Sequence, residues 1–96
     1  MSYSKEYTAT QGAWTLVIDQ QTSGSIQLKD DGPVLVAVAA TAPAVDSEDA
    51  FEIAREDGSL HGLNFTSLEA TDRVYVRSRH DENNTVVAFA PGAAPA

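Results

Sequence analysis

Cysteine is absent from the 96-residue chain, and cations are scarce in it. Without cysteine the chain can form no disulfide, no thiolate zinc site and no cysteine nucleophile. Six lysines and arginines face fourteen aspartates and glutamates, so the formal charge is −8. Because nonspecific nucleic-acid binding depends on many cationic contacts with phosphate, we expect no nucleic-acid partner.

Long hydrophobic runs are missing as well. The longest apolar stretch, residues 34–40, is seven residues long, whereas a membrane-spanning helix needs about 20 residues. The opening residues 1–7 contain no apolar run of the kind that forms the core of a signal peptide. We therefore expect synthesis in the cytoplasm and no membrane partner.

Short segments with a two-residue apolar period fill the middle of the chain, and this period is typical of half-buried β-strands. Trp14, Leu16 and Ile18 share one parity, which predicts a strand with these three side chains in the core. Residues 34–40 are apolar on both parities and predict a central strand covered on both faces. Further strands are expected within residues 26–28, 51–53, 74–76 and 85–90. Residues 60–65 are apolar in part but break parity near Gly62, which predicts a bulge or an irregular edge strand.

Turn signals separate these segments. Asp30-Asp31-Gly32 predicts a hairpin-type turn in which the glycine supplies a positive φ, and residues 56–58 predict a second turn of the same composition. Residues 47–55 are the best helix candidate, because Ser47 could cap a helix there. The alternation of Phe51 and Ile53 favours a strand instead.

These spacings of about 8–12 residues predict an all-β fold, a small antiparallel β-sandwich or barrel of six to seven strands. We place this domain at residues 13–90. Residues 1–12 are expected to form an extended N-terminal arm, and residues 91–96, with two prolines and no large side chain, a flexible C-terminal tail. A small domain buries a limited core, so we also expect a homo-oligomer to add stability.

Residues that could carry catalysis or bind a metal form no motif. The two histidines, His61 and His80, have no companion at a catalytic or ligand spacing, and the Gly-x-Ser-x-Gly elbow is missing. The acidic turns are too short to match a calcium-binding loop, and there is no phosphate-binding glycine-rich loop. We therefore expect no enzyme, no catalytic residue, no metal site and no cofactor.

One charge pattern is unusual. Arg73, Tyr75, Arg77 and Arg79 share one parity, so a strand would place them on one face. In one interpretation the arginines pair across strands with acids such as Glu52. In the other, this arginine–tyrosine stripe docks an acidic partner, such as the acidic face of another copy, because arginine and tyrosine are enriched among interface anchors.

The amino-terminal arm is a second interface candidate. Tyr3, Tyr7 and Trp14 could dock on the same domain or on a neighbouring subunit, and an arm with aromatic anchors is a common way to build assemblies. The alternative is a frayed terminus. The candidate interface residues are therefore Tyr3, Tyr7, Arg73, Tyr75, Arg77 and Arg79.

Three pieces of the sequence together resemble a known family. They are the opening strand Ala13-Trp14-Thr15-Leu16-Val17, the segment from Val36 to the Ala42-Pro43-Ala44 loop, and the strand Asp72-Arg73-Val74-Tyr75-Val76-Arg77-Ser78. The chain resembles small virion proteins of tailed bacteriophages, which are structural components of heads and tails. The resemblance spans most of residues 13–90.

The resemblance implies a structural role without catalytic residues. It leads us to expect a capsid decoration (cement) protein that stabilises the head by subunit contacts, with the major capsid protein or other virion proteins as partners. Its location would be the virion, and the host cytoplasm during assembly. Two alternatives stay open: a head–tail or tail component, and a carbohydrate-binding β-sandwich module. Sugar-binding modules use exposed Trp or Tyr, and the predicted burial of Trp14 counts against the second alternative.

Overall fold

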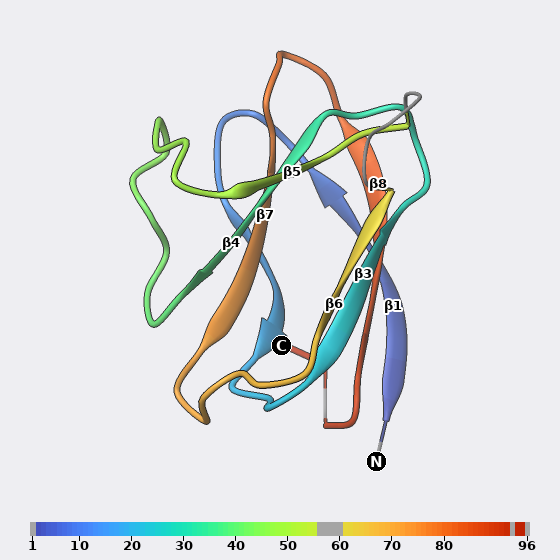
Figure 1. Ribbon diagram of the computed structural model, residues 1–96. Helices are drawn as coiled ribbons and strands as arrows, with labels where there is room; N and C mark the ends of the chain where they lie inside the picture. Colours follow the sequence, from blue (N-terminus) through green and yellow to red (C-terminus); the bar gives the residue numbers. More distant parts are fainter. Residues whose placement is uncertain (1, 56–60, 93, 96) are drawn as a thin grey trace.

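The computed structural model describes residues 2–55, 61–92, 94 and 95, and its regular structure is entirely β (Figure 1). Two four-stranded antiparallel sheets lie face to face, with strand orders β1-β8-β3-β6 and β2-β7-β4-β5. The strands are β1 (Tyr3–Ala9), β2 (Thr15–Asp19), β3 (Gly24–Leu28), β4 (Val34–Ala39), β5 (Phe51–Ile53), β6 (Gly62–Phe65), β7 (Arg73–Ser78) and β8 (Asn84–Ala90).

The order of the strands along the chain defines the topology. Only β4 and β5 are consecutive strands that pair with each other, and every other pair of consecutive strands belongs to different sheets. The chain therefore crosses repeatedly between the two sheets. This arrangement of eight antiparallel strands in two sheets is a jelly roll.

The structure has eight strands instead of six to seven, and the additional one is β1. Residues 3–9, which we expected in an extended arm, pair with β8 along their whole length. Tyr3, Tyr7 and Ala9 point toward the core, but Lys5, which has the same parity, is exposed. Because this lysine interrupts the apolar period, the pattern gives no strand signal. The sheet therefore begins at Tyr3 and not near residue 13.

Other expectations about local structure have mixed outcomes. Gly32 has φ +75°, as the turn signal predicted, but the turn joins β3 to β4 in the other sheet and does not close a hairpin. Residues 51–53 form a strand, so the helix alternative for residues 47–55 is wrong. The turn predicted at residues 56–58 lies outside the described residues, as do positions 93 and 96 of the predicted tail.

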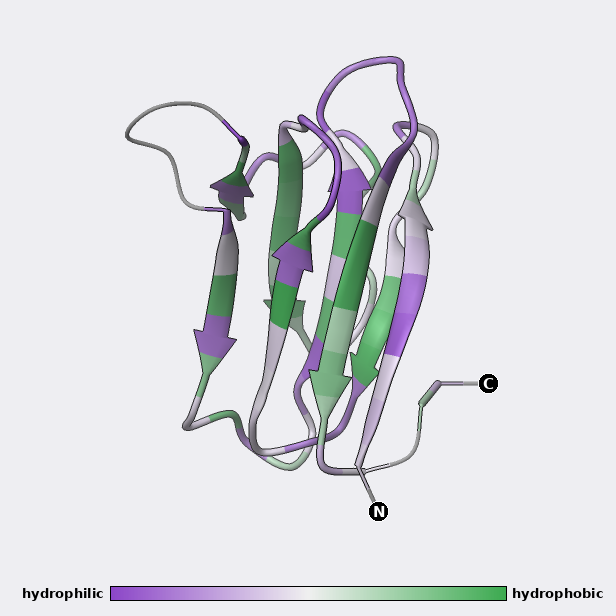
Figure 2. Cartoon of the chain, turned by 90° about the vertical axis from the view of Figure 1, so that its right-hand side faces the viewer, coloured by the Kyte–Doolittle hydropathy of each residue, from purple (hydrophilic) through white to green (hydrophobic). Residues whose placement is uncertain are grey.

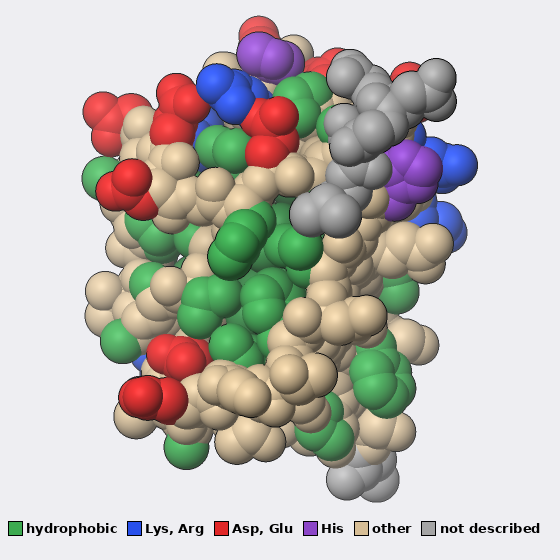
Figure 3. Space-filling view, in the orientation of Figure 1, with side chains coloured by type: hydrophobic (Ala, Val, Ile, Leu, Met, Phe, Trp, Pro, Cys, Tyr) green, Lys and Arg blue, Asp and Glu red, His purple; other side chains and the backbone are tan. Residues whose placement is uncertain are grey.

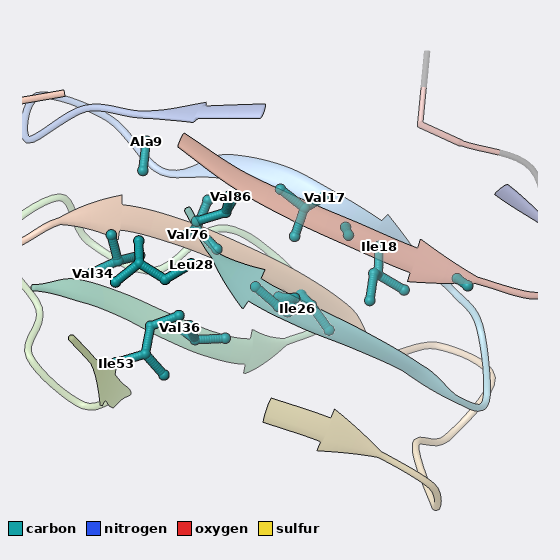
Figure 4. Close-up of a cluster of buried hydrophobic side chains, with 13 residues drawn as sticks. Ala9, Val17, Ile18, Ile26, Leu28, Val34, Val36, Ile53, Val76 and Val86 are labelled. Carbon is teal, nitrogen blue, oxygen red and sulfur yellow. The ribbon is translucent and has the colours of Figure 1, made fainter. Parts of the chain in front are cut away.

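The core is made by aliphatic side chains from both sheets (Figure 4). They alternate with outward-facing residues along the strands, and Figure 2 shows hydrophobic segments following hydrophilic or neutral ones along several strands. Among them, Ile26 and Leu28 come from β3, and Val74 and Val76 come from β7. Burial of these side chains supplies the main stabilisation of a fold of this kind.

Strand β2 departs from simple alternation. The pairing of β2 with β7 shifts register between Leu16 and Ile18, so that Val17 and Ile18 are both fully buried. Leu16 pairs with Tyr75 on the outer face of the sheet, and Trp14 is only partly buried. The prediction that Trp14, Leu16 and Ile18 all enter the core is therefore correct only for Ile18, because a β-bulge moves the neighbouring side chains to the other face.

A buried polar network joins one end of the two sheets. Ser78 Oγ donates a hydrogen bond to the Ala9 carbonyl oxygen at 2.8 Å, and Asn84 Nδ2 donates to Ser78 Oγ at 2.9 Å. The Gly32 amide donates to Asn84 Oδ1 at 2.9 Å. Ser78 and Asn84 are both buried. These bonds fix the end of β1 and the β3–β4 turn to the start of β8 and the end of β7.

Candidate interaction surfaces

The middle of the arginine–tyrosine stripe is covered by the loop of residues 40–50. Arg77 is only 6% exposed. Its Nη2 donates to the Ser47 carbonyl oxygen at 3.1 Å, and its Nη1 to the Gln11 carbonyl oxygen at 3.4 Å. The guanidinium carbon lies 5.2 Å from the centre of the Trp14 ring, a cation–π contact. Trp14 Nε1 in turn donates to the Ala44 carbonyl oxygen at 2.8 Å.

The two outer arginines of the stripe pair with acids. Arg73 Nε lies 2.8 Å from Asp19 Oδ1, and Arg79 forms ion pairs with Glu48 and Glu52. The interpretation in which an arginine pairs with Glu52 is therefore confirmed for Arg79. Such partly exposed pairs contribute little to stability. The docking role of Arg73, Tyr75, Arg77 and Arg79 stays a prediction.

The two tyrosines of β1 pack against their own domain. Both side chains are partly buried against the core. Tyr3 Oη donates to the Val17 carbonyl oxygen at 2.7 Å, which fastens β1 to the facing sheet. Tyr7 Oη is buried and has no hydrogen-bond partner among the described residues. The Tyr3 hydroxyl therefore has a hydrogen-bond partner, and the buried Tyr7 hydroxyl has none among the described residues.

The contrast between the tyrosine hydroxyls gives a prediction about stability. Tyr3→Phe should lower the free energy of unfolding by about 1 kcal/mol, because it removes a made hydrogen bond. Tyr7→Phe should leave it unchanged or raise it by up to about 1 kcal/mol, because it removes a buried polar group that has no partner. Urea denaturation followed by Trp14 fluorescence measures both values. Equal losses in the two variants would contradict this account of β1.

The same residues predict a loss of stability in alkali. Burial first, and then the negative charges of Tyr7 and Asp19, raise the pKa of Tyr3 from 10.0 to about 12, and burial also raises the pKa of Tyr7. The unfolded chain releases these protons at a lower pH than the folded chain. The contribution of these two tyrosines to stability should therefore be constant below about pH 10, and stability should fall as the pH rises toward 12. Replacing both tyrosines with Phe should flatten that fall in a pH series of urea denaturations.

An apolar hollow opens at one edge of the molecule, where β5 begins. The pairing of β5 with β4 ends at Val36–Phe51, and beyond it this edge of β4 has no strand partner in the described part of the chain. Phe51 and the two residues before it line a hollow of about 330 Å³ beside this edge of β4. We call this the edge hollow; its lining residues are Val36, Ala37, Val38, Asp49, Ala50 and Phe51.

Phe51 is the most exposed large hydrophobic side chain of this edge, at 57%. Because Phe51 pairs with the buried Val36, its side chain lies on the inner side of the sheet, where strand parity would place it in the core. Figure 3 shows hydrophobic side chains gathered in the middle of this face, between β4 and β6, with acidic side chains beside them. Exposed Asp46, Glu48 and Asp49 lie in the adjacent loop.

A second hollow, of about 320 Å³, lies on the outer face of the other sheet. Phe89 of β8 lies beside it and is 47% exposed. Ser25 and Asn64 face it from the neighbouring strands, and Thr66 follows β6. We call this the Phe89 hollow. The sequence did not indicate which face of the strand Phe89 occupies, because residues 86–90 are apolar at every position. The structure buries Ala88 and Ala90 and leaves Phe89 exposed.

The remaining candidate residues gather into no centre. His61 and His80 are both exposed. Within residues 2–55 and 61–95, apart from residue 93, no three His, Asp or Glu side chains lie close enough together to hold a metal ion. Nor does this part of the chain contain a helix long and apolar enough to cross a membrane.

Comparison with known proteins gives no relative. No family model, no curated protein and no solved structure matches the chain.

Proposed function

We propose that the chain is a structural virion protein of a tailed bacteriophage, a capsid decoration protein that docks on the major capsid protein through its edge hollow. The observation that carries this proposal is the exposed inner side of the sheet at Phe51, next to the unpaired edge of β4. Its support from the sequence is the resemblance to phage virion proteins. Jelly rolls occur in viral capsid proteins and in lectins, which supports the proposal by analogy only.

The unpaired backbone of β4 can bind a partner by strand addition. Beyond Val36, the amide and carbonyl groups on this edge of β4 can hydrogen-bond to an extended segment of a partner. Phe51 is 57% exposed, so burial of the remaining exposed part of its side chain in the same contact would contribute about 1–2 kcal/mol. The acidic loop beside the hollow favours a partner surface that carries basic groups there. Each contact is modest, and its repetition over the shell would reinforce the head.

Replacing Phe51 tests this docking mode. Particles from a phage that lacks the gene should bind the purified wild-type chain to saturation. Phe51→Ser should bind at least about tenfold more weakly, because the variant loses the apolar anchor. Sedimentation of particles with bound chain, followed by quantification of the chain, measures both affinities.

Phe89→Ser is the matched control, since Phe89 has a similar exposure on the other sheet. It should bind particles as the wild type does. Thermal melting of both variants establishes that they are folded. Equal particle binding by Phe51→Ser and the wild type would overturn docking through the edge hollow, and failure of the wild type to bind would overturn the decoration role. Light scattering measures the molar mass of the free chain. A dimer that Phe51→Ser abolishes would show that a second copy of the chain occupies the edge hollow and would overturn docking on the capsid protein.

A further inference from the structure

The Phe89 hollow combines an exposed aromatic ring with neutral hydrogen-bonding groups. Phe89 pairs with Ser4 on one side and with Ser25 on the other, and Ser25 pairs with Asn64. Directly paired residues project on the same side of a sheet, so these four side chains form one row across the outer face. Thr66 adds a hydroxyl at the rim. The volume is near the lower limit of ordinary small-ligand sites, about 300–1,000 Å³.

The charge of this face is unlike that of the rest of the chain. The row from Ser4 to Asn64 contains no ionisable side chain, although the chain as a whole has a formal charge of −8. Farther along the same face, Glu6 and Lys29 form an ion pair with each other. A charged ligand would therefore find no opposite charge to pair with in the row, and the net field of the protein would repel an anionic one.

The chemistry of the row fits a neutral sugar. The face of an aromatic ring carries partial negative charge and attracts the partly positive C–H groups on one side of a pyranose ring. Serine hydroxyls and the asparagine amide each donate and accept hydrogen bonds, as sugar hydroxyls do. A protein partner fits less well, since a stable protein interface buries about 800 Å² on each side and Phe89 is the one large exposed hydrophobic residue lining this hollow.

We propose that the Phe89 hollow is a binding site for a neutral carbohydrate. A pyranose ring stacks on Phe89, and its hydroxyls form hydrogen bonds with Asn64 and Ser25. The site lies on the opposite sheet from the edge hollow, so a chain docked through β4 and Phe51 can hold a glycan at the same time. The proposal does not depend on the virion role, because a carbohydrate-binding module without any particle would use the same face.

Nuclear magnetic resonance of the full ¹⁵N-labelled chain tests this site. Cellohexaose, maltohexaose and chitohexaose are titrated separately, and the amide shifts are followed. We expect at least one of them to shift the amides of Ser25, Asn64 and Phe89, with a dissociation constant on the order of 1 mM, which is typical of a single shallow contact. The absence of shifts with all three, or shifts confined to other residues, would overturn the proposal.

Variants separate this site from the edge hollow. Phe89→Ala should weaken glycan binding at least about tenfold, Asn64→Ala should weaken it less, and the matched variant Phe51→Ser should bind as the wild type does. Unchanged binding by Phe89→Ala would overturn the assignment. Shifts of the same amides on concentration of the chain alone would identify a second copy as the occupant and would also overturn it. Loss of particle binding by Phe51→Ser with retained glycan binding shows that the two surfaces act independently.

Discussion

Asn84→Ala is expected to lower the free energy of unfolding by about 3 kcal/mol. Asn84 is 3% exposed and connects the Gly32 amide to Ser78 Oγ. Alanine cannot make either bond, so the Gly32 amide loses its acceptor, Ser78 Oγ loses a donor, and a cavity forms beside them. Buried polar groups without partners cost far more than the small net gain of a made hydrogen bond. Urea denaturation monitored by the single tryptophan gives the value.

Asn83→Ala is the control for this prediction. Asn83 is the adjacent residue, has the same side chain and is exposed. Its replacement should change the free energy of unfolding by less than about 0.5 kcal/mol. An Asn84→Ala variant as stable as Asn83→Ala would contradict the buried network that joins the two sheets.

Arg77→Ala should release the loop of residues 40–50 and lower the free energy of unfolding by about 2 kcal/mol. The Arg77 guanidinium binds the carbonyl oxygens of Ser47 and Gln11 and packs against Trp14. Alanine removes these contacts and leaves two carbonyls without their donor. Amide exchange in the loop should accelerate at least about tenfold, since local opening becomes easier. Arg77→Lys should be only slightly more stable than Arg77→Ala, because a single ammonium group cannot replace the planar set of donors of the guanidinium.

Arg79→Ala is the matched control in the same stripe. Arg79 is exposed, and its partners are the exposed acids Glu48 and Glu52. Exposed ion pairs contribute little to stability, so this variant should lose much less stability than Arg77→Ala. If the two arginine variants have the same stability and the same loop exchange, Arg77 does not hold the loop.

The strands that alternation predicted are those whose apolar period is uninterrupted. In β7, Val74 and Val76 enter the core and the stripe residues Arg73, Tyr75 and Arg77 face outward, as their parity required. Strand β1 gave no such signal because Lys5 occupies an inward position at the edge of a sheet, where a long side chain can reach solvent. The bulge in β2 could not be predicted from alternation either, because it depends on the pairing of β2 with β7, which the local sequence does not encode.

The topology and the hollows depend on long-range contacts. The Asp30-Asp31-Gly32 signal predicted the backbone conformation of a turn but not that the following strand joins the other sheet. The sequence marked Ala42-Pro43-Ala44 as a loop without indicating that Arg77 holds this loop against a sheet. Parity placed Phe51 on the core side correctly, yet its exposure results from the absence of a covering strand at that edge in the described chain.

Quantitative mass spectrometry of purified particles tests the central claim most directly. The particles are those of the phage that carries the gene, and the abundance of the chain is compared with that of the major capsid protein. A decoration protein requires hundreds of copies per particle, in a fixed ratio to the shell subunit. A few copies per particle would assign the chain to the neck or tail, and absence of the chain from purified particles would contradict a structural role in the virion.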